Sequence, residues 1–120
     1  MKYICSMTIL SDWDDTIVAL ATPHGTGAIG VVRLSGPAAL QITKKIFKGK
    51  NPEVQAGNTV HYGHLYLNHE WIDEVLITIF KKPHSYTGED VVEISGHGSP
   101  YIIGRIIEAC IDDGARLTKP

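Results

Sequence analysis

The sequence lacks the features that several large classes of protein require. Only two cysteines occur among 120 residues, Cys5 and Cys110, and neither stands in a C-x-x-C or zinc-type pattern. Their scarcity excludes a disulfide-rich scaffold and predicts a reducing, cytoplasmic location. No apolar run approaches the ~20 residues of a membrane-spanning helix. Acidic residues at positions 12, 14 and 15 follow the short apolar start and speak against a secretory signal.

An excess of basic charge is also missing. Eleven lysines and arginines stand against thirteen acidic residues, which gives a net charge of −2. The composition therefore offers no electrostatic footprint for direct nucleic-acid binding. What is present, 43% hydrophobic and 20% charged residues, is typical of one globular domain. We expect a flexible N-terminal tail over residues 1–14 and a single domain over residues 15–120.

One hexapeptide pattern occurs twice, as VVRLSG at residues 31–36 and as VVEISG at residues 91–96. Each copy predicts a buried strand and a Ser-Gly turn, followed by a helix with a proline in its first turn. The two strands differ strongly only at their third position, which is Arg33 in one and Glu93 in the other. The repeat suggests a pseudo-symmetric domain with these two charges at related positions. A charge among valines requires a partner, because an unpaired buried charge is costly.

Hydrophobic periodicity predicts six strands and two helices. The strands are expected at residues 17–22, 28–34, 59–67, 74–80, 90–95 and 115–118, and the helices at residues 37–47 and from Pro100 to a stop at Gly114. The third strand should place Val60, Tyr62, His64 and Tyr66 on one face, and the apolar fourth strand should be central. Strands outnumber helices, so we predict an α+β fold, a mixed sheet with two main helices packed on it.

Two motifs are disfavoured by their context. Residues 25–30 read GTGAIG and match the dinucleotide pattern G-x-G-x-x-G, but a strand rather than a helix is expected to follow them. We interpret this segment as a flexible hairpin loop. His61, His64 and His69 suggest a metal site, yet the first two point to opposite faces of a strand, so no metal ligand is predicted among them.

The sequence also contains no convincing candidate for a catalytic nucleophile. Ser35, Ser95 and Ser99 occupy turn or cap positions, where serine is favoured for its local hydrogen bonds. Cys110 falls on the apolar stripe of the second helix and should be an inert core thiol. His97, in the turn before that helix, allows two interpretations: an anion site at the helix start, or a tight turn that merely tolerates the histidine. No catalytic residue is predicted.

Arg33 and Glu93 also allow two interpretations. Either they form a structural ion pair between neighbouring strands, or they line a cavity and recognise a flat polar ligand. A carboxylate suits a ring edge with two adjacent N–H donors, as in guanine or pterin, and an arginine fork suits carbonyl or carboxylate oxygens. The residues alone leave both interpretations open.

Two long segments carry a family resemblance. DTIVALATPHGTGAIGVVRLSGPAAL and SYTGEDVVEISGHGSP closely resemble the start of the bacterial tRNA-modification GTPase family called MnmE or TrmE, and the match extends over residues 15–120. The resemblance implies a folate-binding domain similar to that of the glycine-cleavage aminomethyltransferase, and a constitutive homodimer. By motif match, the family's folate-contacting arginine and glutamate fall on Arg33 and Glu93. Ser99 departs from the glycine that is common there in the family.

The same resemblance implies a larger functional context. In the family, a helical domain and a Ras-like G domain follow, and the G domain uses GTP, potassium and magnesium. With a flavoprotein partner, MnmG or GidA, the full protein adds a carboxymethylaminomethyl or aminomethyl group to the wobble uridine of tRNA. A tetrahydrofolate derivative, 5-formyl- or methylene-tetrahydrofolate, supplies the one-carbon unit.

Two parts of that machinery do not occur in this sequence. One is the P-loop pattern, and the other is the family's third folate contact, a lysine that would follow Pro120. The resemblance therefore leads us to expect a chain that binds tetrahydrofolate and forms a homodimer. The alternative is a free-standing folate-dependent aminomethyl transferase domain, and the presence or absence of a P-loop in the gene product distinguishes the two.

Overall fold

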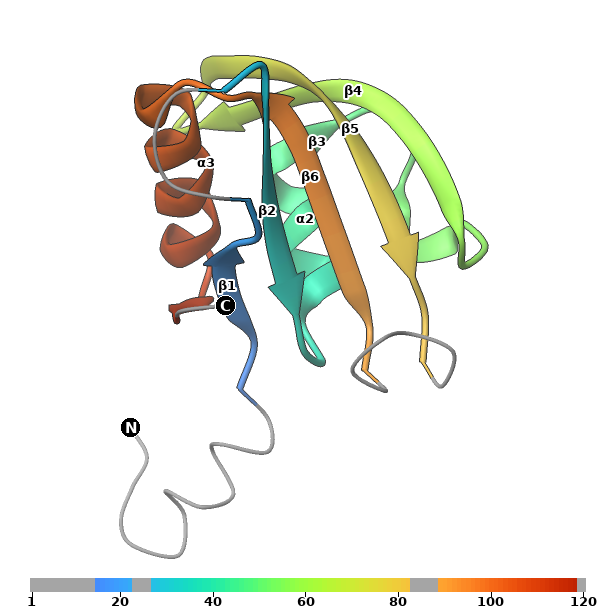
Figure 1. Cartoon of the computed structure of the whole chain (residues 1–120). Helices are drawn as coiled ribbons and strands as arrows, with labels where there is room; N and C mark the ends of the chain where they lie inside the picture. Colours follow the sequence, from blue (N-terminus) through green and yellow to red (C-terminus); the bar gives the residue numbers. More distant parts are fainter. Residues whose placement is uncertain (1–14, 23–26, 83–88, 119–120) are drawn as a thin grey trace, which may run out of the picture.

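The computed structural model describes residues 15–22, 27–82 and 89–118, so the tail expected over residues 1–14 lies outside the described part. Within that part, seven strands form one sheet in the order β3-β4-β5-β6-β2-β1-β7 (Figure 1). All neighbouring strands are antiparallel except β1 and β7, which are parallel. The strands are β1 (Ile17–Leu20), β2 (Ile29–Ser35), β3 (Phe47–Lys48), β4 (Thr59–Leu67), β5 (Glu70–Phe80), β6 (Val91–His97) and β7 (Arg116–Leu117). The helices are α2 (Ala39–Ile46), the short 3-10 helix η1 (Pro52–Val54) and α3 (Pro100–Asp112).

Both α-helices pack against the same face of the sheet, and the hydrophobic core lies between the helices and the strands (Figure 1). Fully buried side chains in this layer include Val18, Val32, Leu34, Leu65, Ile77, Ile94 and Ile106. The predicted α+β fold, a mixed sheet with two helices, is therefore confirmed. Among the described helices, none is long and apolar enough to cross a membrane.

The other face of the sheet is not covered by either helix, and we call it the open face. In β4, Leu65 is buried whereas Val60 and Tyr62 are exposed, so the predicted alternation is confirmed. β5 is an internal strand, as predicted, but only its helix-facing side is buried. Ile77 on that side is 0% exposed, whereas Leu76 on the open face is 46% exposed.

β5 begins at Glu70, earlier than predicted, because the preceding turn is shorter. Asn68 and His69 both adopt positive φ angles, of 50° and 68°, which is typical of the two-residue turn that suits strand twist in a hairpin. A register shift between Leu65 and Tyr66 interrupts the alternation near this turn, and this irregularity explains why the periodicity placed the strand start too late.

α2 begins at Ala39 rather than at Pro37, which is a correction to the predicted helix. Pro37 belongs to a turn in which the backbone N–H of Ala39 donates to the carbonyl of Gly36 at 3.2 Å. The backbone N–H of Ala38 donates to the hydroxyl oxygen of Thr16 at 2.9 Å, so the turn is fixed by the start of β1. The sequence also did not predict β3 and η1, which lie in the segment between α2 and β4.

α3 begins and ends as its sequence predicts. The hydroxyl of Ser99 accepts from the backbone N–H of Ile102 at 3.4 Å, and Pro100 is the first helical residue. After the helix, Gly114 has a φ of 112°, where a left-handed stop was expected. The short β7 then pairs with β1, so the predicted last strand is confirmed in a shorter form.

Two glycines give opposite predictions for alanine. Gly36 has a φ of 137°, and a Cβ there would lie 2.7 Å from the carbonyl oxygen of Asp15, whereas Gly104 in α3 has open space around it. We expect Gly36→Ala to lower the free energy of unfolding by about 1–3 kcal/mol and Gly104→Ala to raise it by roughly 0.5–1 kcal/mol. Urea denaturation of both variants measures the difference, and two equal effects would contradict the turn geometry.

Cys110 is fully buried on α3, as predicted, and burial together with the nearby Asp113 raises the pKa of its thiol from 9.0 to about 12. The thiolate therefore forms first in the unfolded chain, so this group stabilises the fold fully below its unfolded pKa of 9.0 and progressively less as the pH rises toward 12. In a Cys5→Ser background, we expect no labelling by Ellman's reagent near neutral pH until denaturant unfolds the chain. A Cys110→Ala variant should lose this part of the alkaline decline, and fast labelling of the folded protein would contradict the burial.

Candidate functional site on the open face

The two hexapeptide copies lie side by side in the sheet. β2 and β6 pair antiparallel, with Arg33 directly opposite Glu93 and Val31 opposite Ser95. The alternate positions of both strands point into the core, and they are Val32, Leu34, Val92 and Ile94. The two charges therefore occupy related positions, as the repeat suggested, and both lie on the open face.

Arg33 and Glu93 form an ion pair. Oε2 of Glu93 accepts from Nη2 of Arg33 at 2.6 Å and from Nε at 3.0 Å. The side chains are 37% and 27% exposed, so the pair is half-buried and remains within reach of solvent. The structural interpretation of these residues, an ion pair between neighbouring strands, is therefore observed.

The same geometry leaves hydrogen-bonding capacity for a ligand. Both bonds use one carboxylate oxygen, and within the described residues neither Oε1 of Glu93 nor Nη1 of Arg33 has a partner. An ion pair at this exposure contributes about 0–1 kcal/mol to stability because solvent screens it. The pair therefore retains an acceptor and a donor that a ligand on the open face can use.

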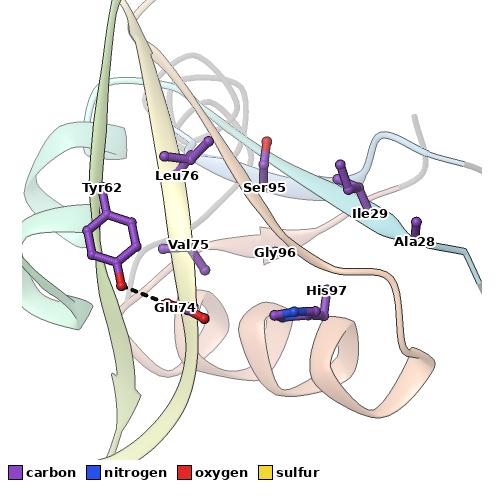
Figure 2. Close-up of a pocket in the computed structure, with 9 residues that line it drawn as sticks. All are labelled: Ala28, Ile29, Tyr62, Glu74, Val75, Leu76, Ser95, Gly96 and His97. Carbon is purple, nitrogen blue, oxygen red and sulfur yellow. Dashed lines mark hydrogen bonds between the residues drawn. The ribbon is translucent and has the colours of Figure 1, made fainter.

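A hollow of about 240 Å³ lies further along β6 on the same face (Figure 2). Its wall is mainly apolar, with Ile29 on one side and Leu76 on the other, and Glu74 and His97 stand at its polar end (Figure 2). The remaining lining residues are Ala28, Tyr62, Val75, Ser95 and Gly96. Arg33 and Glu93 are not among the lining residues, but Ser95 follows Glu93 on the same side of β6, so the hollow and the ion pair share one surface.

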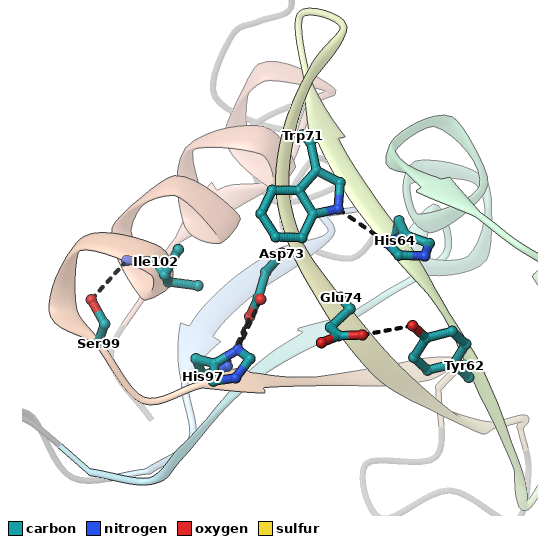
Figure 3. A network of polar contacts seen from close by, with 8 residues as sticks. All are labelled: Tyr62, His64, Trp71, Asp73, Glu74, His97, Ser99 and Ile102. Atoms are coloured by element: carbon teal, nitrogen blue, oxygen red, sulfur yellow. Dashed lines mark hydrogen bonds and ion pairs between the residues drawn. The ribbon is translucent and has the colours of Figure 1, made fainter.

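Asp73 and His97 form a second polar pair at the edge of this hollow (Figure 3). Oδ2 of Asp73 accepts from the backbone N–H of His97 at 2.9 Å, and Oδ1 lies 2.8 Å from the ring Nδ1. Asp73 is 3% exposed, whereas the side chain of His97 is 64% exposed. A buried carboxylate thus holds an imidazole that faces solvent.

Sequence reasoning missed Asp73 because it placed the start of the strand at Glu74, and it assigned no role to Glu74 itself. The one local signal is an Asp-Glu pair inside an otherwise apolar strand. Gly96 is a second signal: a Cβ at this position would lie 2.9 Å from Oδ2 of Asp73, so glycine leaves the space that the carboxylate fills. Both glycines of the repeat therefore have a spatial reason: Gly96 leaves room for Asp73, and Gly36 leaves room for the backbone of Asp15.

Two backbone donors of the anion site considered for His97 are already bonded within the protein. The N–H of His97 donates to Asp73, and the N–H of Gly98 donates to the carbonyl of Ala28 at 3.3 Å. The hydroxyl of Ser99 serves as the helix cap. The tight-turn interpretation fits these bonds better than the anion site does. It needs one correction: His97 is not merely tolerated, because its ring is hydrogen-bonded to Asp73.

Aromatic and acidic side chains complete the network between β4 and β5 (Figure 3). The hydroxyl of Tyr62 donates to Oε1 of Glu74 at 2.6 Å, and this contact with a carboxylate raises the pKa of the tyrosine. The indole N–H of Trp71 donates to Nδ1 of His64 at 3.0 Å. Tyr62 and Glu74 line the hollow itself, and the contact between Trp71 and His64 extends the aromatic surface along β4 and β5.

The three histidines of β4 and its turn do not converge. His64 lies on the open face, where it accepts a hydrogen bond from Trp71. His61 has a different partner, because its Nε2 lies 2.9 Å from the hydroxyl oxygen of Thr59. Among the described residues, no group of three or more His, Cys, Asp and Glu side chains is placed to hold a metal ion.

Comparison with known proteins gives a consistent family signal. The family model described as "GTP-binding protein TrmE N-terminus" matches residues 16–120. A protein named "tRNA modification GTPase MnmE" from Cytophaga hutchinsonii is 49% identical over 115 residues, which are 96% of this chain and 25% of the relative. Proteins of the same name from Streptococcus thermophilus (46% identical, 95% of this chain, 25% of the relative) and Flavobacterium johnsoniae (50%, 86% and 23%) are also similar. The chain thus spans about a quarter of the length of these relatives.

Proposed function

The chain belongs to the family of TrmE N-termini, and we propose that it binds a reduced folate and forms a homodimer within a GTPase that modifies the wobble uridine of tRNA. One observation carries the proposal. The two charges that the family resemblance implies as folate contacts, Arg33 and Glu93, are paired on the open face, and each keeps one polar atom that has no partner among the residues that the structure describes.

The chemistry of these groups suits a reduced pterin. The free Oε1 of Glu93 accepts from the aminopyrimidine edge, whose adjacent N–H donors match a carboxylate. Arg33 donates from its free Nη1 to a carbonyl or carboxylate oxygen of the folate. The half-buried position of the pair strengthens such charge-assisted bonds relative to a fully exposed site. The ligand in this proposal is 5-formyl- or methylene-tetrahydrofolate.

The wider role rests on the names of the relatives and on the family resemblance. The proposal includes GTP, potassium and magnesium in a G domain outside this sequence, the flavoprotein MnmG as a partner, and a cytoplasmic location. We also propose, from the family resemblance, that a lysine after Pro120 contributes to the folate site, and we therefore expect the 120-residue chain to bind folate more weakly than the complete gene product does. The fold is proposed to be like the folate domain of the glycine-cleavage aminomethyltransferase.

The open face also supports the proposed homodimer. Ile29, Val60, Tyr62 and Leu76 are apolar or aromatic side chains on this face, and each is between 46% and 64% exposed. A second copy that covers part of this face would remove apolar surface from water, at about 25 cal/mol for each Å². The loop over residues 25–30 and the loop around Pro83 are further proposed contacts, but residues 23–26 and 83–88 lie outside the described part.

Calorimetry with 5-formyltetrahydrofolate tests the folate proposal. We expect saturable binding to the complete gene product, weaker binding to the 120-residue chain, and no binding of GTP to the 120-residue chain, which lacks a P-loop. Absence of folate binding to the complete gene product would contradict the proposal and favour a purely structural domain. A gene product that binds folate but has no P-loop would indicate a free-standing aminomethyl transferase instead.

A further inference from the structure

Among the described residues, the buried carboxylate of Asp73 forms its hydrogen bonds with one residue, His97. Oδ2 accepts from the backbone N–H of His97, and the two oxygens lie 2.8 and 3.0 Å from the ring Nδ1. The backbone bond alone would fasten the end of β6 to β5, beyond the last backbone pair between Leu76 and Ser95. The contacts with the ring have a different effect: they fix the orientation of the His97 side chain, which is 64% exposed.

These contacts determine which ring nitrogen carries hydrogen. An ionised carboxylate only accepts hydrogen bonds, so Nδ1 of His97 carries the hydrogen, and Nε2 of the neutral ring is an acceptor. Within the described residues, no group bonds to Nε2. His97 lines the hollow (Figure 2), so it presents an oriented acceptor without a partner there.

The surroundings of His97 favour a ligand with hydrogen-bond donors. Asp73 and Glu74 both bring negative charge to this end of the hollow. Of the two carboxylate oxygens of Glu74, only Oε1 has a partner within the described part of the chain, the hydroxyl of Tyr62. An anionic group would be repelled here, whereas a neutral or cationic N–H group would be attracted. Leu76, 46% exposed, offers an apolar wall for the flat body of such a ligand.

We propose that His97, positioned by Asp73, accepts a hydrogen bond from an N–H group of the bound reduced folate. The inference rests on the proposed function, because it takes the folate to lie on the open face. At about 3.3 Å per residue, His97 lies roughly 13 Å along β6 from Glu93. 5-Formyltetrahydrofolate carries N–H groups both on its pterin ring and on the link to its aminobenzoyl ring, so one elongated ligand can reach both residues.

Two variants distinguish a role of His97 in ligand contact from a purely structural role in linking β6 to β5. His97→Ala removes the acceptor, and Asp73→Asn keeps an oxygen for the backbone N–H while offering an amide N–H to Nδ1, which shifts the ring hydrogen to Nε2. We expect each variant to weaken binding of 5-formyltetrahydrofolate to the complete gene product by about tenfold. His61→Gln, a histidine outside the hollow, is the matched control and should bind like the wild type. Nitrogen NMR of the His97 ring should show hydrogen on Nδ1 in the wild type and on Nε2 in Asp73→Asn.

The outcomes distinguish the two proposals. If the wild type binds folate and Glu93→Gln weakens binding, but His97→Ala binds normally, Asp73 and His97 only fasten β6 to β5 and the inference is overturned alone. Hydrogen on Nε2 in the wild-type ring would also overturn it. If the wild type binds no folate, the proposed function fails and the inference with it. If Asp73→Asn does not fold, the folate affinity of His97→Ala and the nitrogen NMR spectrum of the wild-type His97 ring still test the inference.

Discussion

Replacing Glu93 by glutamine is expected to weaken binding of 5-formyltetrahydrofolate to the complete gene product by roughly 10- to 100-fold. Glutamine keeps the size of the side chain but loses its charge, and hydrogen bonds to charged groups contribute about 1.5–3 kcal/mol. The amide also replaces one acceptor oxygen by a donor, which faces the N–H donors of the aminopyrimidine edge. The loss should appear in the dissociation constant measured by calorimetry.

Folding should survive this substitution, so the binding result can be interpreted directly. The Arg33–Glu93 pair is half-exposed, and its loss should lower the free energy of unfolding by at most about 1 kcal/mol. Glu108→Gln, on the exposed side of α3, is the matched control and should leave both stability and folate affinity unchanged. Unchanged affinity in Glu93→Gln would remove the residue from the proposed site and leave the ion pair as its only role.

Replacing Ile94 by alanine is expected to have the largest effect on stability. Ile94 is 0% exposed, and it pairs with Val32 on one side and with Ile77 on the other, in the middle of the helix-covered face. Truncation of a buried isoleucine leaves a cavity among packed neighbours and costs about 2–5 kcal/mol. Such a loss is a large fraction of the 5–15 kcal/mol that is typical of a domain.

The next residue along β6 provides the control for this experiment. Ser95 lies on the open face, so Ser95→Ala should change the free energy of unfolding by less than about 0.5 kcal/mol. Urea denaturation of the two variants compares the two faces of one strand. Equal losses at both positions would contradict a sheet that is covered by helices on one face only.

The sequence allowed the elements to be predicted where their signals are local. Alternation in β4 separated Leu65 from Tyr62, and Ser99 with Pro100 located the start of α3. The predicted start of α2 was wrong because the turn after Gly36 depends on a hydrogen bond from Ala38 to Thr16, a residue that is distant in sequence and directly precedes β1. Local propensity contains no information about that contact.

The candidate site likewise has features that local sequence signals predict and features that depend on contacts between distant residues. The odd charges of the repeat drew attention to Arg33 and Glu93, but the register that places them opposite each other depends on pairing between strands far apart in the chain. Asp73 was missed for a related reason, because its partner His97 lies on β6 and only the folded sheet brings the two together. The sequence therefore identified single candidate residues, and the fold was needed to identify their partners.

The central claim is that a reduced folate binds the open face at the Arg33–Glu93 pair. Its most direct test is the NMR signal of the Arg33 Nε–H group, which donates to Glu93 at 3.0 Å in the free protein. On addition of 5-formyltetrahydrofolate to the complete gene product, we predict that this signal shifts in a saturable way, together with the amide of Ser95, while the amides of α2 and α3 stay in place. Saturable binding that leaves the Arg33 signal unchanged, or that shifts the helices instead, would contradict the account.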